Sequence, residues 1–108
     1  MPPNDELTQR IRSVVALDPR VTEKRMFGGI CFLLDGKILA SARRTGTMML
    51  QLGADAAAEA VKQPGVAYMV MKGKNTPNFV DVDLGVLETD DDLRHWIGIA
   101  ERYVASKR

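Results

Sequence analysis

Apolar residues near the amino terminus recur at steps of three and four, which is the period of an amphipathic helix. The residues on this stripe are Leu7, Ile11, Val14 and Val15. Asn4 is a suitable cap, and Asp5 and Glu6 suit the positive end of the helix dipole. Asp18-Pro19 ends the pattern, because the residue before proline is pushed out of the helical region. We therefore expect a first helix that begins near residue 5 and ends before Asp18.

From residue 24 the pattern changes to short apolar runs separated by turn residues, which predicts a meander of strands. The runs cover residues 25–27, 30–34, 37–43 and 47–52. Asp35-Gly36 lies between the second and third runs and predicts a type I′ hairpin turn, since both central positions need a positive φ. The run 30–34 is apolar without alternation, so we expect both faces of that strand to be covered.

A second helix and a hairpin follow the meander. Residues 53–63 are rich in good helix formers and end at Pro64-Gly65, which predicts a short helix. Residues 66–71 then read as a strand, 72–77 as a loop and 79–84 as the returning strand. In that last strand Val80, Val82 and Leu84 are expected to face inward, with Asp81 and Asp83 on the wet face.

Thr89 followed by Asp90, Asp91 and Asp92 predicts the start of a final helix, because a hydroxyl can cap it and carboxylates suit its first turn. Its apolar stripe is Leu93, Trp96, Ile97, Ala100, Tyr103 and Val104. We therefore expect one α+β domain over residues 1–108. It has two layers: an antiparallel sheet of about six strands, arranged as a meander plus a hairpin, packed with amino-terminal, middle and carboxy-terminal helices.

Composition excludes several classes of small domain. The 108 residues contain one cysteine and one histidine, too few for an internal disulfide or a cysteine–histidine zinc site. No segment resembles a signal peptide, and no apolar run approaches the roughly 20 residues that cross a bilayer. We expect a cytoplasmic protein that uses no membrane, no metal and no cofactor.

Charge is divided unevenly although the net charge is only +1. Residues 1–74 hold 11 basic and 7 acidic side chains, and residues 75–108 hold 4 and 7. If the meander brings Arg43 and Arg44 beside Lys72 and Lys74, these four could contact phosphates or a partner protein. The favoured alternative is that they are solvated charges at loop ends.

Residues that could support catalysis are few. Cys31 and His95 are the one conceivable thiol–imidazole pair, but Cys31 lies in an apolar run and His95 lies off the apolar stripe of the final helix. The three consecutive aspartates lack the spacing of a calcium loop. Asp81 and Asp83 share a strand face but read as solubilising charges. Neither Gly28-Gly29 nor the segment 72–76 matches a nucleotide-binding motif. No catalytic residue is predicted.

The run Arg25-Met26-Phe27-Gly28-Gly29, followed by an apolar strand and the Asp35-Gly36 turn, resembles the signature of the TfoX amino-terminal domain family. The similarity continues through residues 49–53 and 79–82 and into the final helix. The resemblance implies an α+β domain with an antiparallel sheet, gives these motif residues a structural role and implies no catalytic residues.

The TfoX family is named after regulators of natural competence, which assist transcription of DNA-uptake genes beside a cyclic-AMP receptor protein. Those regulators carry a second, carboxy-terminal domain, and this chain is expected to correspond to the first domain alone. The leading hypothesis is a non-enzymatic bacterial domain that contacts a transcription protein or DNA. The alternatives are a small-ligand or enzymatic module with Cys31, Tyr68 and His95 in its pocket, and a homodimerising scaffold that pairs through a sheet edge or helix face.

Overall fold

The computed structural model describes residues 5–26, 29–43, 46–71 and 73–106. Its elements follow one another in the order that the sequence predicts, with one short 3₁₀ helix added. They are α1 (Asp5–Val15), β1 (Val21–Met26), β2 (Gly29–Leu34), β3 (Lys37–Ala42), β4 (Thr47–Gln51), α2 (Ala54–Ala60), β5 (Val66–Met71), β6 (Lys74–Asp83), η1 (Leu84–Val86) and α3 (Asp90–Ser106).

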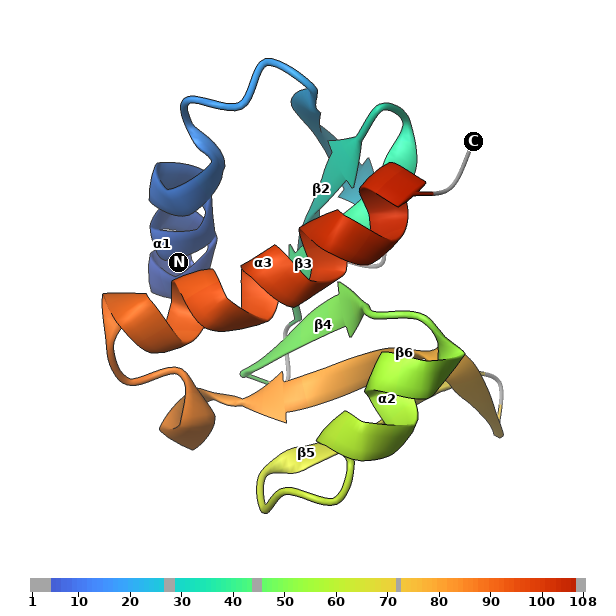
Figure 1. Cartoon of the computed structure of the whole chain (residues 1–108). Helices are drawn as coiled ribbons and strands as arrows, with labels where there is room; N and C mark the ends of the chain where they lie inside the picture. Colours follow the sequence, from blue (N-terminus) through green and yellow to red (C-terminus); the bar gives the residue numbers. More distant parts are fainter. Residues whose placement is uncertain (1–4, 27–28, 44–45, 72, 107–108) are drawn as a thin grey trace.

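The six strands form one antiparallel sheet in the order β1-β2-β3-β4-β6-β5. α3 crosses β3 and β4, and α2 lies against β6 (Figure 1). The predicted α+β class, with a meander and a hairpin packed against three helices, is therefore confirmed. None of the described helices is long and apolar enough to cross a membrane.

The turn between β2 and β3 has the predicted type I′ backbone. Asp35 has φ 51° and Gly36 has φ 82°, so both central residues lie in the left-handed region. Leu34 pairs with Lys37 immediately beyond the turn. The turn thus fixes the register of the two strands, as expected.

Both faces of the sheet are buried at its centre. One row, formed by Phe32, Ala40, Leu50 and Val80, packs in the main core with apolar side chains from all three helices. The row of opposite parity contains Cys31, Ser41 and Met49, which are at most 2% exposed. It continues to the partly buried Asp81 and then to the exposed Ala67 of β5. Adjacent residues of a strand point to opposite faces, so the buried pair Cys31 and Phe32 confirms that β2 is covered on both sides.

Two strands differ in extent from the prediction. β1 begins at Val21, three residues before the change of period, because Val21 and Thr22 are β-branched and pair with Leu34 and Leu33. β6 begins at Lys74 and includes Pro77, which was expected to lie in a loop. The register with β5 shifts between Tyr68 and Met69, so Pro77 has no partner in β5 and its missing N–H breaks no ladder.

Two side chains near the end of β6 are placed differently from the prediction. Leu84 was expected to face the core, but it begins η1 and is 42% exposed. Asp81 was expected on a wet face, but its side chain is only 19% exposed and pairs with Arg43. Asp83 is exposed, as predicted. The sheet ends at Asp83, so strand alternation no longer determines where Leu84 points.

The start of α3 has a reciprocal cap. The Asp92 amide donates to Thr89 Oγ1 at 3.0 Å, and the Thr89 amide donates to the Asp92 carboxylate at 3.2 Å. This arrangement satisfies two amides that a helix start otherwise leaves without partners. The helix-start interpretation of Thr89 and the three aspartates is therefore confirmed, and the stripe Leu93, Trp96, Ile97, Ala100 and Val104 is buried.

Candidate functional site: an acidic-rimmed pocket beside α1

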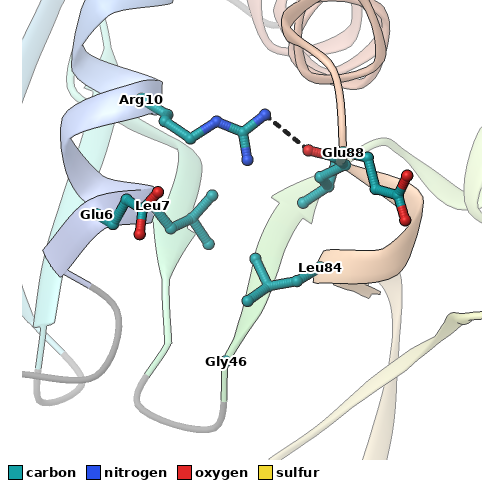
Figure 2. Close-up of a pocket in the computed structure, with 7 residues that line it drawn as sticks. Glu6, Leu7, Arg10, Gly46, Leu84 and Glu88 are labelled. Carbon is teal, nitrogen blue, oxygen red and sulfur yellow. Dashed lines mark hydrogen bonds between the residues drawn. The ribbon is translucent and has the colours of Figure 1, made fainter.

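A pocket of about 150 Å³ opens where three segments distant in sequence meet. α1 contributes one wall, the β3–β4 turn contributes the edge at Gly46, and η1 with the segment before α3 contributes the other wall (Figure 2). The lining residues are Glu6, Leu7, Arg10, Gly46, Leu84, Leu87 and Glu88. Leu7 and Leu84 lie on opposite sides of the gap, so the pocket has an apolar interior.

Arg10 holds the two walls of the pocket together. Its Nη2 donates to the Leu87 carbonyl at 2.7 Å and to the Thr89 carbonyl at 3.3 Å, and it lies 3.9 Å from the Asp90 carboxylate. Arg10 is not part of the apolar stripe of α1, yet its side chain is only 26% exposed. Its charge is directed to carbonyls that precede α3, so Arg10 positions the pocket wall.

The rim of the pocket carries more carboxylates than cations. Glu6 and Glu88 are exposed and have no ionic partner among the described residues. The exposed aspartates Asp90 and Asp91 lie next in the chain at the start of α3. Among the described lining residues, Arg10 is the cation, and its charge already faces carbonyl oxygens. The carboxylates of the rim therefore attract positive groups.

The size of the pocket limits what can enter it. Small-molecule and cofactor sites usually occupy about 300–1,000 Å³, whereas an apolar cavity of about 150 Å³ holds a group the size of benzene. The pocket therefore encloses only a small group. One aliphatic side chain fits, and a lysine or arginine can bury its methylene stem there while its charge stays among the rim carboxylates.

Sequence patterns did not identify this pocket. Leu7 was assigned to the core stripe and Leu84 to the sheet, and neither Arg10 nor Glu88 belonged to a motif. The acidic start of α3 was the one signal available, and it is explained by capping. The pocket exists because α1 packs against the segment before α3, a contact between residues nearly 80 positions apart.

A second, wider hollow of about 530 Å³ lies between α1, the α1–β1 loop and β1. Its charged lining is already paired: Arg12 makes two 2.7 Å bonds to Glu23, and Arg20 bonds to Asp18 at 2.8 Å and 3.0 Å. These contacts lower the pKa of Glu23 and bring the pKa of Asp18 to about 2. A ligand would have to replace these ion pairs, so the smaller pocket is the better candidate.

Comparison with known proteins gives the family of the chain. The family model of the TfoX N-terminal domain matches residues 14–102. The chain belongs to the TfoX N-terminal domain family. No curated protein matches it. The predicted resemblance is therefore confirmed over most of the sequence.

A solved structure shares the fold of this TfoX N-terminal domain. It is the crystal structure of Deinococcus radiodurans protein DR2400, which contains the domain DUF419. The TM-score is 0.74 at 17% sequence identity, and the match covers 93% of this chain and 79% of that chain. At this identity the likeness shows a common fold.

Two of the four basic residues proposed as a contact patch, Arg43 and Lys74, lie far apart along β6 in this TfoX N-terminal domain. The Arg43 amide donates to the Thr47 carbonyl, and Thr47 pairs with Asp83, so Arg43 lies at the carboxyl end of β6. Lys74 begins β6 at its opposite end, about 25–30 Å away at the usual rise per residue. Arg44 and Lys72, and the side chain of Lys74, lie outside the described residues.

Arg43 is also neutralised by its own sheet. Its guanidinium donates to the Asp81 carboxylate, and Thr47 Oγ1 lies 3.4 Å from the same carboxylate. Burial raises the pKa of Asp81, while Arg43 and Thr47 act in the opposite direction. The favoured interpretation of Arg43 as a solvated charge was wrong, because its side chain forms an ion pair with the partly buried Asp81.

The thiol–imidazole pair considered from the sequence is not formed. Cys31 is fully buried on the face of opposite parity to the main core, and burial raises the pKa of its thiol to about 11. His95 is exposed on α3, where its ring and the Trp96 ring are nearly perpendicular and their centroids lie 5.8 Å apart. Tyr68 packs on the main-core side of β5. These three residues therefore line no common pocket.

The family motif occupies the first hairpin of the sheet. Arg25 is an exposed β1 residue paired with Ile30, and Met26 pairs with Gly29. Phe27 and Gly28 lie outside the described residues. Asp35 and Gly36 form the turn described above, so the described part of the motif shapes hairpins. Within the described ranges, no three histidine, cysteine or acidic side chains gather closely enough to hold a metal ion.

Proposed function

We propose that this TfoX N-terminal domain is a non-enzymatic interaction module of transcriptional regulation, and that it binds a basic, partly apolar segment of a partner protein. The observation that supports the proposal is the pocket beside α1. Its interior takes one aliphatic side chain, and its rim carries the carboxylates of Glu6 and Glu88, which form no ion pair with another described residue.

Charge and size together favour a protein segment over DNA at this surface. A phosphate backbone is repelled by the rim carboxylates and by the acidic start of α3, whereas a lysine or arginine side chain is attracted. The partner proposed here is a transcription protein, by analogy with the competence regulators from which the family takes its name. That analogy is one of family membership, because function resides in the site rather than in the fold.

The chemistry of the pocket is tested by titrating isotopically labelled protein with two blocked tetrapeptides, Leu-Arg-Leu-Lys and Leu-Glu-Leu-Glu. We expect the basic peptide to shift amide resonances of residues 6–10 and 84–88 with a Kd of about 0.1–1 mM, a range typical of one small pocket. The acidic peptide is expected to cause no saturable shift. Equal binding of both peptides, or shifts confined to other residues, would reject the proposal.

Two charge-reversed variants separate the pocket from net charge. Glu6→Lys with Glu88→Lys is expected to weaken binding of the basic peptide at least tenfold. Asp55→Lys with Glu59→Lys changes the net charge equally at exposed positions of α2 and is expected to leave the binding nearly unchanged. If both pairs weaken binding equally, the effect is long-range attraction and the pocket is not the site.

The regulatory part of the proposal needs a cellular measurement. Transcripts are compared between source cells that carry the native gene, the pocket pair of substitutions and the α2 pair. We expect a defined set of transcripts to change with the pocket pair alone. The same pocket variant is also purified, to verify that it is folded and does not bind the peptide. If it meets both conditions and the transcripts still do not change, the pocket binds peptide but does not control transcription.

A further inference from the structure

The two edge strands of the sheet, β1 and β5, differ in how well they are protected against pairing with another chain. β1 has the sequence VTEKRM, with the exposed charges of Glu23, Lys24 and Arg25 at its centre. β5 has the sequence VAYMVM, without a charge or a proline. Edge strands present unpaired N–H and C=O groups, and charged or proline residues are the usual means of blocking their pairing with another chain. Only β1 carries that protection.

β5 offers a continuous edge for pairing. All six of its residues pair with β6 on one side, and the extra residues at the register shift belong to β6. No described strand pairs with its other side. Val70 is 53% exposed although its neighbour Met69 is only 4% exposed, so an apolar side chain stands uncovered at this edge. In Figure 1 β5 is the outermost strand of the sheet.

We propose that β5 pairs antiparallel with β5 of a second copy of this chain, which joins two six-stranded sheets into one. Two copies of the uncharged β5 can pair without removing a charged side chain of the strand from water, whereas β1 carries three charged side chains at its centre, which hinder edge pairing. Pairing through β5 about a twofold axis also closes the assembly, because both ends of the joined sheet are then charged β1 edges. The asymmetry of the edges thus favours a dimer over a filament.

The faces of the sheet restrict the register of such a pair. Directly opposed residues of antiparallel strands point to the same face. Val66 and Tyr68 face the main core, and Val70 has the same parity, so these residues must oppose residues of that parity in the second copy. The register that covers Val70 best places it opposite Tyr68, since aromatic and β-branched side chains pair favourably across strands.

Sedimentation equilibrium at protein concentrations of about 10–500 µM tests the dimer, a range suited to an interface at the small end of specific ones. We expect the wild-type mass to rise toward twice 11.9 kDa. Val70→Lys is expected to raise the dissociation constant at least tenfold. Leu17→Lys is the matched control, because Leu17 is 97% exposed in the α1–β1 loop, and it is expected to dimerise as wild type does.

Hydrogen exchange identifies which edge is involved. In the wild type, alternate amides of β5 are expected to gain protection as the concentration rises, while the Val70→Lys variant retains native circular dichroism without that gain. A wild type that stays monomeric throughout overturns the proposal. So does a dimer that Val70→Lys leaves intact, or one that protects β1 amides, because each places the contact on another surface.

Discussion

At the scale of single residues, the structure gives several charged side chains roles that their sequence positions do not reveal. Arg10 holds carbonyls before α3, and Arg43 pairs with the partly buried Asp81. Arg10 is not part of the apolar stripe of α1, and Arg43 directly follows the end of β3, so neither position in the sequence predicts the contact that its side chain makes. Which side chain a cation meets depends on which elements pack together.

Arg43→Ala is expected to destabilise the domain by about 1–3 kcal/mol, because it leaves the largely buried Asp81 carboxylate without its cation. Without Arg43 the pKa of Asp81 rises further, so the ionised form costs more in the folded state. The cost is present above that raised pKa and disappears as the pH falls below the ordinary aspartate range.

Urea denaturation at pH 7 and pH 4 measures this effect. Arg12→Ala is the control, since the Arg12–Glu23 pair is 40% and 37% exposed and is expected to contribute at most about 1 kcal/mol. Equal losses for the two variants at pH 7 would contradict the buried role of Arg43. A loss for Arg43→Ala that does not shrink at pH 4 would contradict the role of Asp81.

Glu101 is the second residue with a pH-dependent prediction. Burial raises its pKa, and the nearby Asp18 carboxylate raises it further. Ionised Glu101 therefore costs stability above its raised pKa, and the cost is lost as the pH falls through that value. Glu101→Gln is expected to stabilise the protein at pH 7, by at most about 1 kcal/mol, and to have little effect at pH 4.

Thermal unfolding at the two pH values checks this, with Glu59→Gln on the exposed face of α2 as control. The control is expected to show no comparable pH-dependent gain. A gain for Glu101→Gln that is equally large at pH 4 would assign it to a cause other than the carboxylate charge.

At the scale of elements, most strands and helices follow from local patterns, and their ends depend on contacts. The Asp35-Gly36 turn and the Thr89 cap have the geometry that their residues predict. Gly53 was read as the start of a helix-forming segment, but it also has φ 86° and lies against the ring of Tyr103 on α3. A Cβ at Gly53 would lie 2.4 Å from that ring.

Gly53→Ala and Gly36→Ala form a matched pair that separates backbone strain from crowding. Gly36 has φ 82° with no atom near an added Cβ, so its substitution is expected to cost about 1–2 kcal/mol from left-handed strain alone. Gly53→Ala adds crowding against Tyr103 and is expected to cost a further 1–3 kcal/mol, roughly the usual penalty of overpacking.

Chemical denaturation gives the two losses, and the Tyr103→Ala background identifies the cause of the difference. In that background Gly53→Ala is expected to cost about as much as Gly36→Ala does in the wild type. If the extra loss at Gly53 persists without the ring, the contact with Tyr103 does not explain it.

At the scale of the whole molecule, the packing of the two ends of the chain determines the charge distribution. The basic first two-thirds of the sequence suggested a basic face, yet α1 places Glu6 beside the acidic residues that precede and begin α3. β6 separates Arg43, which lies near its carboxyl end, from Lys74, which begins the strand. Charged residues that belong to the same part of the sequence are therefore not neighbours in the folded domain.

Because Arg43 is paired with Asp81 and lies at the other end of β6 from Lys74, we expect weak DNA binding without a defined site. The test is a titration of a 12-base-pair duplex at 50 and 200 mM salt. We expect the double variant Lys72→Ala with Lys74→Ala to bind the duplex as weakly as the wild type does. If the wild type binds at low salt and the double variant reduces the salt slope by about two, the lysines do contact phosphates and the prediction is wrong.

The sequence by itself determined the family, the α+β class, the order of the elements and the two local devices at Asp35-Gly36 and Thr89. These depend on periodicity, backbone preference and side-chain bonds that span only a few residues. The tertiary structure alone decided the pocket, the Arg43–Asp81 pair, the exposure of Leu84 and the unprotected edge at β5. Each of these depends on which distant segments become neighbours, and the free energy that selects those neighbours is spread over the whole buried core.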